Sequence, residues 1–79
     1  MDDERPIFLQ VAELIGNQII DGALPEGAQV PSINELAAFH RINPATALKG
    51  VNRLADAGLL VKQRGIGMFV APDAQARLL

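Results

Sequence analysis

Five cations in the second half of the chain could together bind a polyanion. Residues 36–70 have a charge balance of +4, from Arg41, Lys49, Arg53, Lys62 and Arg64 against Asp56. Residues 1–35 have a balance of −6, from Arg5 against Asp2, Asp3, Glu4, Glu13, Asp21, Glu26 and Glu35. The formal net charge of −2 hides this separation. Because attraction to phosphates acts over roughly 8–10 Å at physiological salt, the local balance decides it. A solvated surface without any partner is the alternative interpretation of the same cations.

Side chains suited to catalysis or metal binding are sparse. His40 is the only histidine and cysteine is absent, which excludes disulfides and thiolate zinc sites. His40 has no evident serine or cysteine partner, because Ser32 is better used as a helix cap. The carboxylates show no paired spacing. We therefore expect neither an enzyme nor a bound metal.

Two glycines in the stretch RGIGMF, Gly65 and Gly67, could belong to a phosphate-binding loop. The stretch lacks the third glycine and the following helix of a dinucleotide loop, and it lacks the Lys-Ser/Thr ending of a P-loop. β-compatible residues lie on both sides instead, at 59–64 and 68–70. The pattern predicts a β-hairpin with RGIG as its turn, and no cofactor.

The elements before this hairpin are expected to be helices. Apolar residues recur at helical spacing over 7–21, namely at Ile7, Val11, Leu14, Ile15 and Ile19. Gly22 supplies a left-handed stop. A proline–glycine turn follows at 25–27, and Gln29-Val30 is predicted to be extended before Pro31.

Capping signals define two further helices. Ser32 and Glu35 match a capping box, which predicts a helix over 33–40. We expect it to bury Ile33, Leu36, Ala37 and also Phe39. After only three residues, Asn43 as N-cap and Pro44 at the first position begin a third helix, which ends near residue 57 before Gly58. Two capped helices joined by a tight turn form a helix-turn-helix.

The third helix separates into an apolar and a polar face at 100° per residue. The expected core stripe consists of Ala47, Val51, Leu54 and Gly58, with Ala55 beside it. The opposite face carries Ala45, Thr46, Lys49, Asn52 and Arg53, with Lys49 at its centre. Small side chains at its start would let this face approach a groove floor, so that the longer ones reach base edges or phosphates. The alternative is an ordinary solvated face of an amphipathic helix.

These elements predict an α+β, mostly helical fold of three helices followed by a C-terminal hairpin. Residues 1–71 are expected to form this domain. Residues 72–79 read as the start of a further helical segment, which either continues in a longer chain or packs on a partner.

The order of motifs resembles the GntR family of bacterial transcription regulators over roughly residues 6–71. The similarity lies in Gln10, VPSxxELA, NPATALKGVNRLADAGLL and RGIGMFV. The start of the third helix and Lys49 are most similar to the YtrA-type subgroup, whose members carry a short helical dimerisation tail.

The resemblance implies a winged helix-turn-helix that binds double-stranded operator DNA as a homodimer. It places the third helix in the major groove and the hairpin, as the wing, at the neighbouring minor groove. The implied contacts are Ser32, Asn34, Asn43, Ala45, Thr46, Lys49, Arg64, Gly65 and Gly67, and Ile66 is expected at the wing tip. Most relatives have arginine where this chain has Asn34, and many have it where this chain has Leu48. Asn34 can still bond adenine or a phosphate, and Leu48, at the edge of the core stripe, either touches a thymine methyl or packs.

We therefore expect a sequence-specific DNA-binding domain of a cytoplasmic regulator, a repressor acting on a short inverted repeat. No run of apolar residues is long enough to span a bilayer, and the sequence assigns no effector. The rival interpretation is a winged-helix module that binds protein and shows no salt-sensitive retention on duplex DNA. A purely structural dimerisation domain is a third, which leaves the cationic hairpin unexplained.

Overall fold

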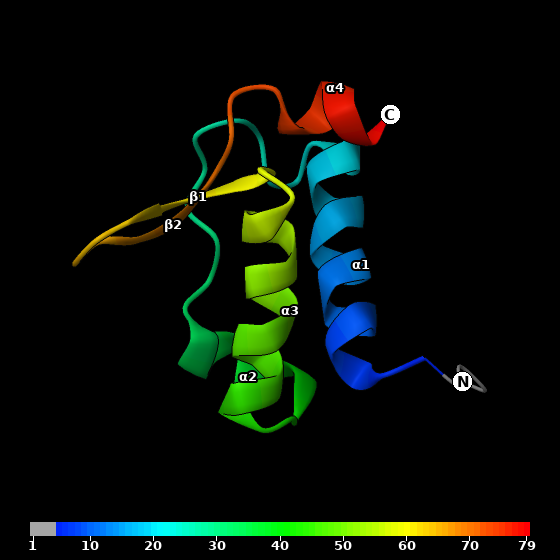
Figure 1. Ribbon diagram of the computed structural model, residues 1–79, viewed down its shortest axis with the longest axis vertical. Helices are drawn as coiled ribbons and strands as arrows, with labels where there is room; N and C mark the ends of the chain where they lie inside the picture. The colour runs from blue at the N-terminus through cyan, green and yellow to red at the C-terminus, as the bar shows by residue number, and fades with distance from the viewer. Residues whose placement is uncertain (1–4) are drawn as a thin grey trace.

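The computed structural model describes residues 5–79, so Asp2, Asp3 and Glu4 lie outside the described part. Three helices come first, α1 (Ile7–Asp21), α2 (Ile33–His40) and α3 (Pro44–Asp56). The antiparallel strands β1 (Leu60–Gln63) and β2 (Gly67–Val70) follow, and then a short helix α4 (Ala74–Leu78). The helices form the body of the molecule and the hairpin projects from it (Figure 1). The predicted winged helix-turn-helix is confirmed.

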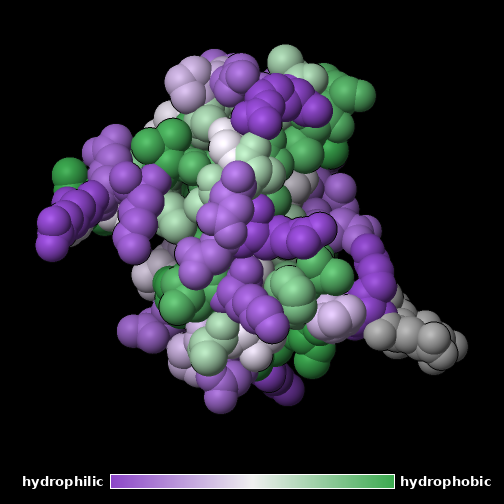
Figure 2. Space-filling model, viewed as in Figure 1, coloured by the Kyte–Doolittle hydropathy of each residue, from purple (hydrophilic) through white to green (hydrophobic). Residues whose placement is uncertain are grey.

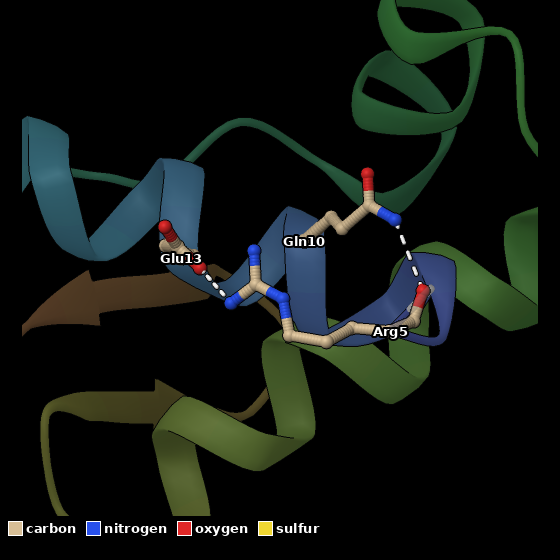
Figure 3. A network of polar contacts seen from close by, with 3 residues as sticks. All are labelled: Arg5, Gln10 and Glu13. Atoms are coloured by element: carbon tan, nitrogen blue, oxygen red, sulfur yellow. Dashed lines mark hydrogen bonds and ion pairs between the residues drawn. The ribbon is translucent and has the colours of Figure 1, made fainter. Parts of the chain in front are cut away.

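α1 begins and ends where its sequence predicts. Gly22 follows it with φ +87°, the left-handed conformation that glycine adopts without a Cβ penalty. No side chain caps its first turn, but a polar network fixes the chain there: the Arg5 guanidinium contacts the Glu13 carboxylate, and the Gln10 amide donates to the Arg5 carbonyl over 3.0 Å (Figure 3). Ile7 and Leu14 of the apolar pattern are exposed.

α2 and α3 form the predicted helix-turn-helix. The turn between them depends on Arg41, which adopts a left-handed φ of +55° and donates its backbone N–H to the Ala38 carbonyl. Most of the predicted core stripe of α3 is confirmed, since Ala47, Val51 and Leu54 are buried. Two expectations were wrong. Phe39 is 81% exposed, because α2 presents only Leu36 and Ala37 fully to the core, and Gly58 lies in the exposed turn after α3.

α3 packs closely against α1, and Gly50 allows this approach. A Cβ built on Gly50 would lie 2.8 Å from the Phe8 carbonyl oxygen and 3.2 Å from the Val11 side chain. The core stripe therefore includes Gly50, which the pattern of apolar residues did not reveal. α3, the second helix of the helix-turn-helix, is therefore positioned by close contact with the backbone of α1.

The hairpin is fastened to the body through a third extended segment. Its register pairs Leu60 with Val70 and Gln63 with Gly67. The chain at 27–30 runs along the free edge of β2: the Val30 N–H donates to the Met68 carbonyl over 2.8 Å, and the Val70 N–H donates to the Ala28 carbonyl over 2.9 Å. The predicted extended conformation at Gln29-Val30 is thus confirmed. This segment pairs with β2 and holds the hairpin against the body.

α4 connects the end of the chain to both long helices. Its Arg77 guanidinium donates to the Ala57 and Gly58 carbonyls over 2.7 and 3.1 Å, which satisfies carbonyl groups at the end of α3. The Gln75 amide donates to the Ile20 carbonyl near the end of α1 over 3.0 Å. Across residues 5–79, no helix has both the length and the apolar character required to cross a bilayer.

Candidate nucleic-acid interface

A surface groove lies between α3 and the hairpin. It is lined by the segment 29–33, by Leu48, Val51 and Asn52 of α3, and by residues 62, 63 and 65–68 of the hairpin. Five of the predicted site residues therefore meet in one place: Ser32, Asn52, Gly65, Ile66 and Gly67. Polar side chains cover much of the hairpin and the exposed side of α3, with apolar patches between them (Figure 2).

The first turn of α2 forms one wall of this groove. The Ser32 hydroxyl accepts from the Glu35 backbone N–H over 3.1 Å, and the Glu35 carboxylate accepts from the Ser32 N–H over 3.0 Å. The predicted capping box is confirmed. Hydrogen bonds from Ser32 lower the pKa of the Glu35 carboxyl. The backbone N–H of Ser32 has the larger effect and its side chain the smaller one. Asn34 is exposed on the same turn.

Replacing Ser32 with alanine is expected to lower the free energy of unfolding by about 1 kcal/mol. Because the folded-state pKa of Glu35 is lowered, its stabilising contribution is complete above the ordinary carboxyl pKa and is lost as the pH falls through the lowered value. Urea unfolding at several pH values should therefore show a weaker loss of stability in acid for Ser32→Ala than for the wild type. Unchanged melting with impaired DNA binding would instead indicate that Ser32 contacts DNA directly.

The start of α3 is held by its own cap. The Asn43 carboxamide oxygen accepts from the Ala45 N–H over 2.8 Å, and Pro44 occupies the first turn. The cap uses the side-chain oxygen of Asn43, and the residue itself is exposed. Ala45 is exposed beside it, and Thr46 is half-buried.

Lys49 and Arg53 do not lie in the groove beside the hairpin. The Lys49 ammonium is 4.4 Å from the centroid of the Phe8 ring, so this side chain leans from the outward face toward the start of α1. Arg53 lines a separate groove between α1 and α3, together with Glu13 and Asn17. Lys49 is exposed, and the side chains of both α3 cations, Lys49 and Arg53, lie on the α1 side of the helix.

Both glycines of the hairpin turn stand where a larger residue would be strained or would clash. The Ile66 N–H donates to the Gln63 carbonyl over 3.0 Å, and Gly65 has a φ of +78° inside this turn. A Cβ on Gly67 would lie 2.7 Å from the Gln29 amide nitrogen, which itself donates to the Ile66 carbonyl over 3.1 Å. Ile66 is 63% exposed at the tip and Arg64 is exposed beside it. The turn is a hairpin tip braced by Gln29.

The groove also contains residues that the sequence did not single out as contacts. Gln29 braces the tip from a position 37 residues away in the chain, and no local signal announces this. Leu48 and Lys62 line the groove beside the predicted contacts. The sequence marked Leu48 as a departure from the relatives' arginine at the edge of the core stripe, with a contact to a thymine methyl and plain packing as the two alternatives.

Within the described part of the chain, no three histidine, cysteine or acidic residues are grouped as a metal site would need. The His40 ring packs edge-on against the Phe39 ring, with 5.0 Å between their centroids.

Comparison with curated proteins shows relatives among transcriptional regulators. The uncharacterised HTH-type transcriptional regulator YhcF of Bacillus subtilis is 31% identical over 71 residues, covering 90% of this chain and 59% of YhcF. The HTH-type transcriptional repressor YtrA of the same organism is 28% identical over 74 residues, covering 94% of this chain and 57% of YtrA. The chain thus spans less than two thirds of the length of these relatives.

Solved structures share the fold. A GntR family regulator from Listeria monocytogenes matches 99% of this chain and 70% of its own, with a TM-score of 0.91 and 28% identity. YtrA from Sulfolobus acidocaldarius, described as a GntR-family transcription factor, matches 89% of this chain and 73% of its own, with a TM-score of 0.83 and 36% identity. The DNA-binding domain of AraR, solved with operator ORX1, matches 85% of this chain and 81% of its own, with a TM-score of 0.81 and 33% identity.

The family model described as "Bacterial regulatory proteins, gntR family" matches residues 8–70, which include α1 except its first residue, α2, α3 and the hairpin. YtrA-named proteins appear in both comparisons, which confirms the expected similarity to that subgroup. This chain belongs to the GntR family of bacterial regulatory proteins.

Proposed function

We propose that this chain is the sequence-specific DNA-binding domain of a bacterial transcriptional regulator, and that the regulator is a repressor. The observation that carries the proposal is the groove in which the start of α2, the outward face of α3 and the wing meet. A relative of the same fold was solved on its operator, and YtrA is named a repressor. No catalytic role is assigned, and the regulator acts in the cytoplasm.

In this proposal α3 enters the major groove and the wing approaches the neighbouring minor groove. Asn34, Asn43, Ala45, Thr46, Lys49 and Asn52 face the major groove and its phosphates, and Arg64 to Gly67 face the minor groove. Ser32 supports the start of α2 at the DNA backbone. Lys49, on the α1 side of α3, and Arg64, on the wing, are the cations assigned to phosphates or base edges.

Homodimerisation is part of the proposal. A single domain with few cations is expected to bind weakly, and two linked copies gain affinity through effective concentration. Two-fold symmetric binding predicts a short inverted repeat as the operator. Retention on duplex DNA that falls steeply with salt is the expected result. A protein-binding module would show no such retention.

Lys49 provides a first test on α3. We expect Lys49→Ala to weaken specific duplex binding roughly tenfold, or ~1.4 kcal/mol, because it removes a cation that can reach a base edge or phosphate. Loss of the contact with Phe8 should cost only about 0.5–1 kcal/mol of stability. Fluorescence anisotropy with a labelled operator measures the affinity, and thermal melting checks the fold.

Arg53→Ala is the matched comparison, since it removes a cation one turn later from the groove against α1. We expect a smaller loss of affinity from this variant. An unchanged operator affinity for Lys49→Ala would refute the assignment of Lys49. A larger loss for Arg53→Ala would place the DNA on the α1 side of α3.

A further inference from the structure

Leu48 is an exposed apolar residue within the proposed DNA-binding groove. Its side chain is 44% exposed and lies one helical turn before Asn52, on the outward side of α3. Single exposed leucines are common on protein surfaces and carry no meaning alone. The position of Leu48 is more informative, because the groove that it lines also contains Ser32, Asn52 and Ile66.

The chemistry of a leucine restricts what it can recognise there. It has no donor or acceptor, so it cannot bond a phosphate or the polar edge of a base. In the major groove the apolar group among the base edges is the C5 methyl of thymine. Covering that methyl with a leucine removes apolar surface of both groups from water.

The local structure keeps Leu48 available for such a contact. Ala47 and Val51 beside it are buried, so α3 is fixed in rotation about its axis. The cap at Asn43 and the close contact of Gly50 with α1 fix its start and its depth. Leu48 therefore presents its side chain from a rigid element, which is what a specificity contact needs.

We propose that Leu48 reads a thymine methyl in the major groove, so that each operator half-site carries a thymine facing it. This inference rests on the proposed function. It adds the identity of one base, and it assigns discrimination to an apolar side chain in the groove. The contact distinguishes thymine from cytosine and purines by the methyl alone.

The test replaces thymine by deoxyuracil, which removes only the C5 methyl and keeps the base pair. Each thymine of a selected operator duplex is replaced in turn, and affinity for the wild-type chain is measured by anisotropy at fixed salt. One position per half-site is expected to weaken binding about fourfold. The same replacement should have no effect on Leu48→Ala, which completes a double-mutant cycle.

Val61 supplies the matched control. It is also 44% exposed, but it lies on β1 and does not line the groove. Val61→Ala should keep the full sensitivity to deoxyuracil. Thermal melting should show that both variants fold, and a wild-type scan without any deoxyuracil effect overturns the inference even if one of them does not.

The outcomes separate this inference from the proposed function. Selective binding with no deoxyuracil effect at any thymine overturns the role of Leu48 and leaves the proposed function standing. A deoxyuracil effect of equal size in Leu48→Ala also overturns it, because another residue then reads the methyl. Absence of selective duplex binding by the wild type overturns both.

Discussion

Replacement of Gly50 by alanine is expected to lower the free energy of unfolding by about 1–3 kcal/mol, despite alanine's higher helix propensity. The added Cβ would lie 2.8 Å from the Phe8 carbonyl oxygen, which is backbone and cannot rotate away. α1 and α3 must therefore separate. Urea unfolding followed by circular dichroism measures the loss. Operator affinity should also fall, because α3 moves relative to the wing.

Gly16 is the matched control for this prediction. It lies within α1, and a Cβ built on it meets nothing within 4 Å. Gly16→Ala should therefore raise the free energy of unfolding by about 0.5–1 kcal/mol, the usual gain inside a helix. Equal stabilisation by both substitutions would contradict the close packing of α3 on α1.

Removal of the Arg64 side chain is expected to weaken binding to every duplex, whatever its sequence. Arg64 is exposed on the wing, where a cation can approach phosphates or the minor groove but not a unique base edge. The slope of log K against log salt should become shallower by about 0.9 for Arg64→Ala. Affinities for an operator and for an unrelated duplex, measured over a range of salt, test this directly.

Arg64→Lys separates charge from shape. It keeps the cation, so the salt slope should remain near that of the wild type, while the planar guanidinium is lost. If the loss in Arg64→Ala were confined to a single operator base pair, Arg64 would be a base-reading residue and its assignment to the backbone would be wrong.

The parts of the fold that sequence predicted well are those set by neighbouring residues. The capping box of Ser32 and Glu35 and the Asn43 cap define α2 and α3, because both partners of each hydrogen bond lie within three residues. The left-handed Gly22 likewise marks the end of α1. These signals operate before any tertiary structure forms, so they can be read directly.

The features that sequence did not predict depend on contacts between distant segments. Nothing near Gly50 indicates that α1 crosses at that point, and nothing near Gln29 indicates that it will brace Ile66. Phe39 was expected to be buried with Leu36 and Ala37, but only these two residues of α2 are buried and Phe39 is 81% exposed. Helical periodicity predicts which residues of a helix share a face, but it does not predict which other segment packs against that face.

The same distinction applies to the candidate site. Periodicity placed Lys49 and Asn52 together on the outward face of α3. The structure separates them: Asn52 lies in the groove with the wing, whereas Lys49 leans over Phe8 of α1. Which edge of the helix meets the hairpin is decided by long-range packing. The sequence left Leu48 between packing and a thymine methyl, and the structure places it in the groove beside Asn52.

Selection of binding sites from random DNA duplexes tests the central claim most directly. The chain is incubated with the library at low salt, washed at rising salt, and the retained duplexes are sequenced. We expect one enriched short element, arranged as an inverted repeat where two copies bind, and retention that falls steeply with salt. Retained sequences indistinguishable from the starting library, with retention independent of salt, would contradict it.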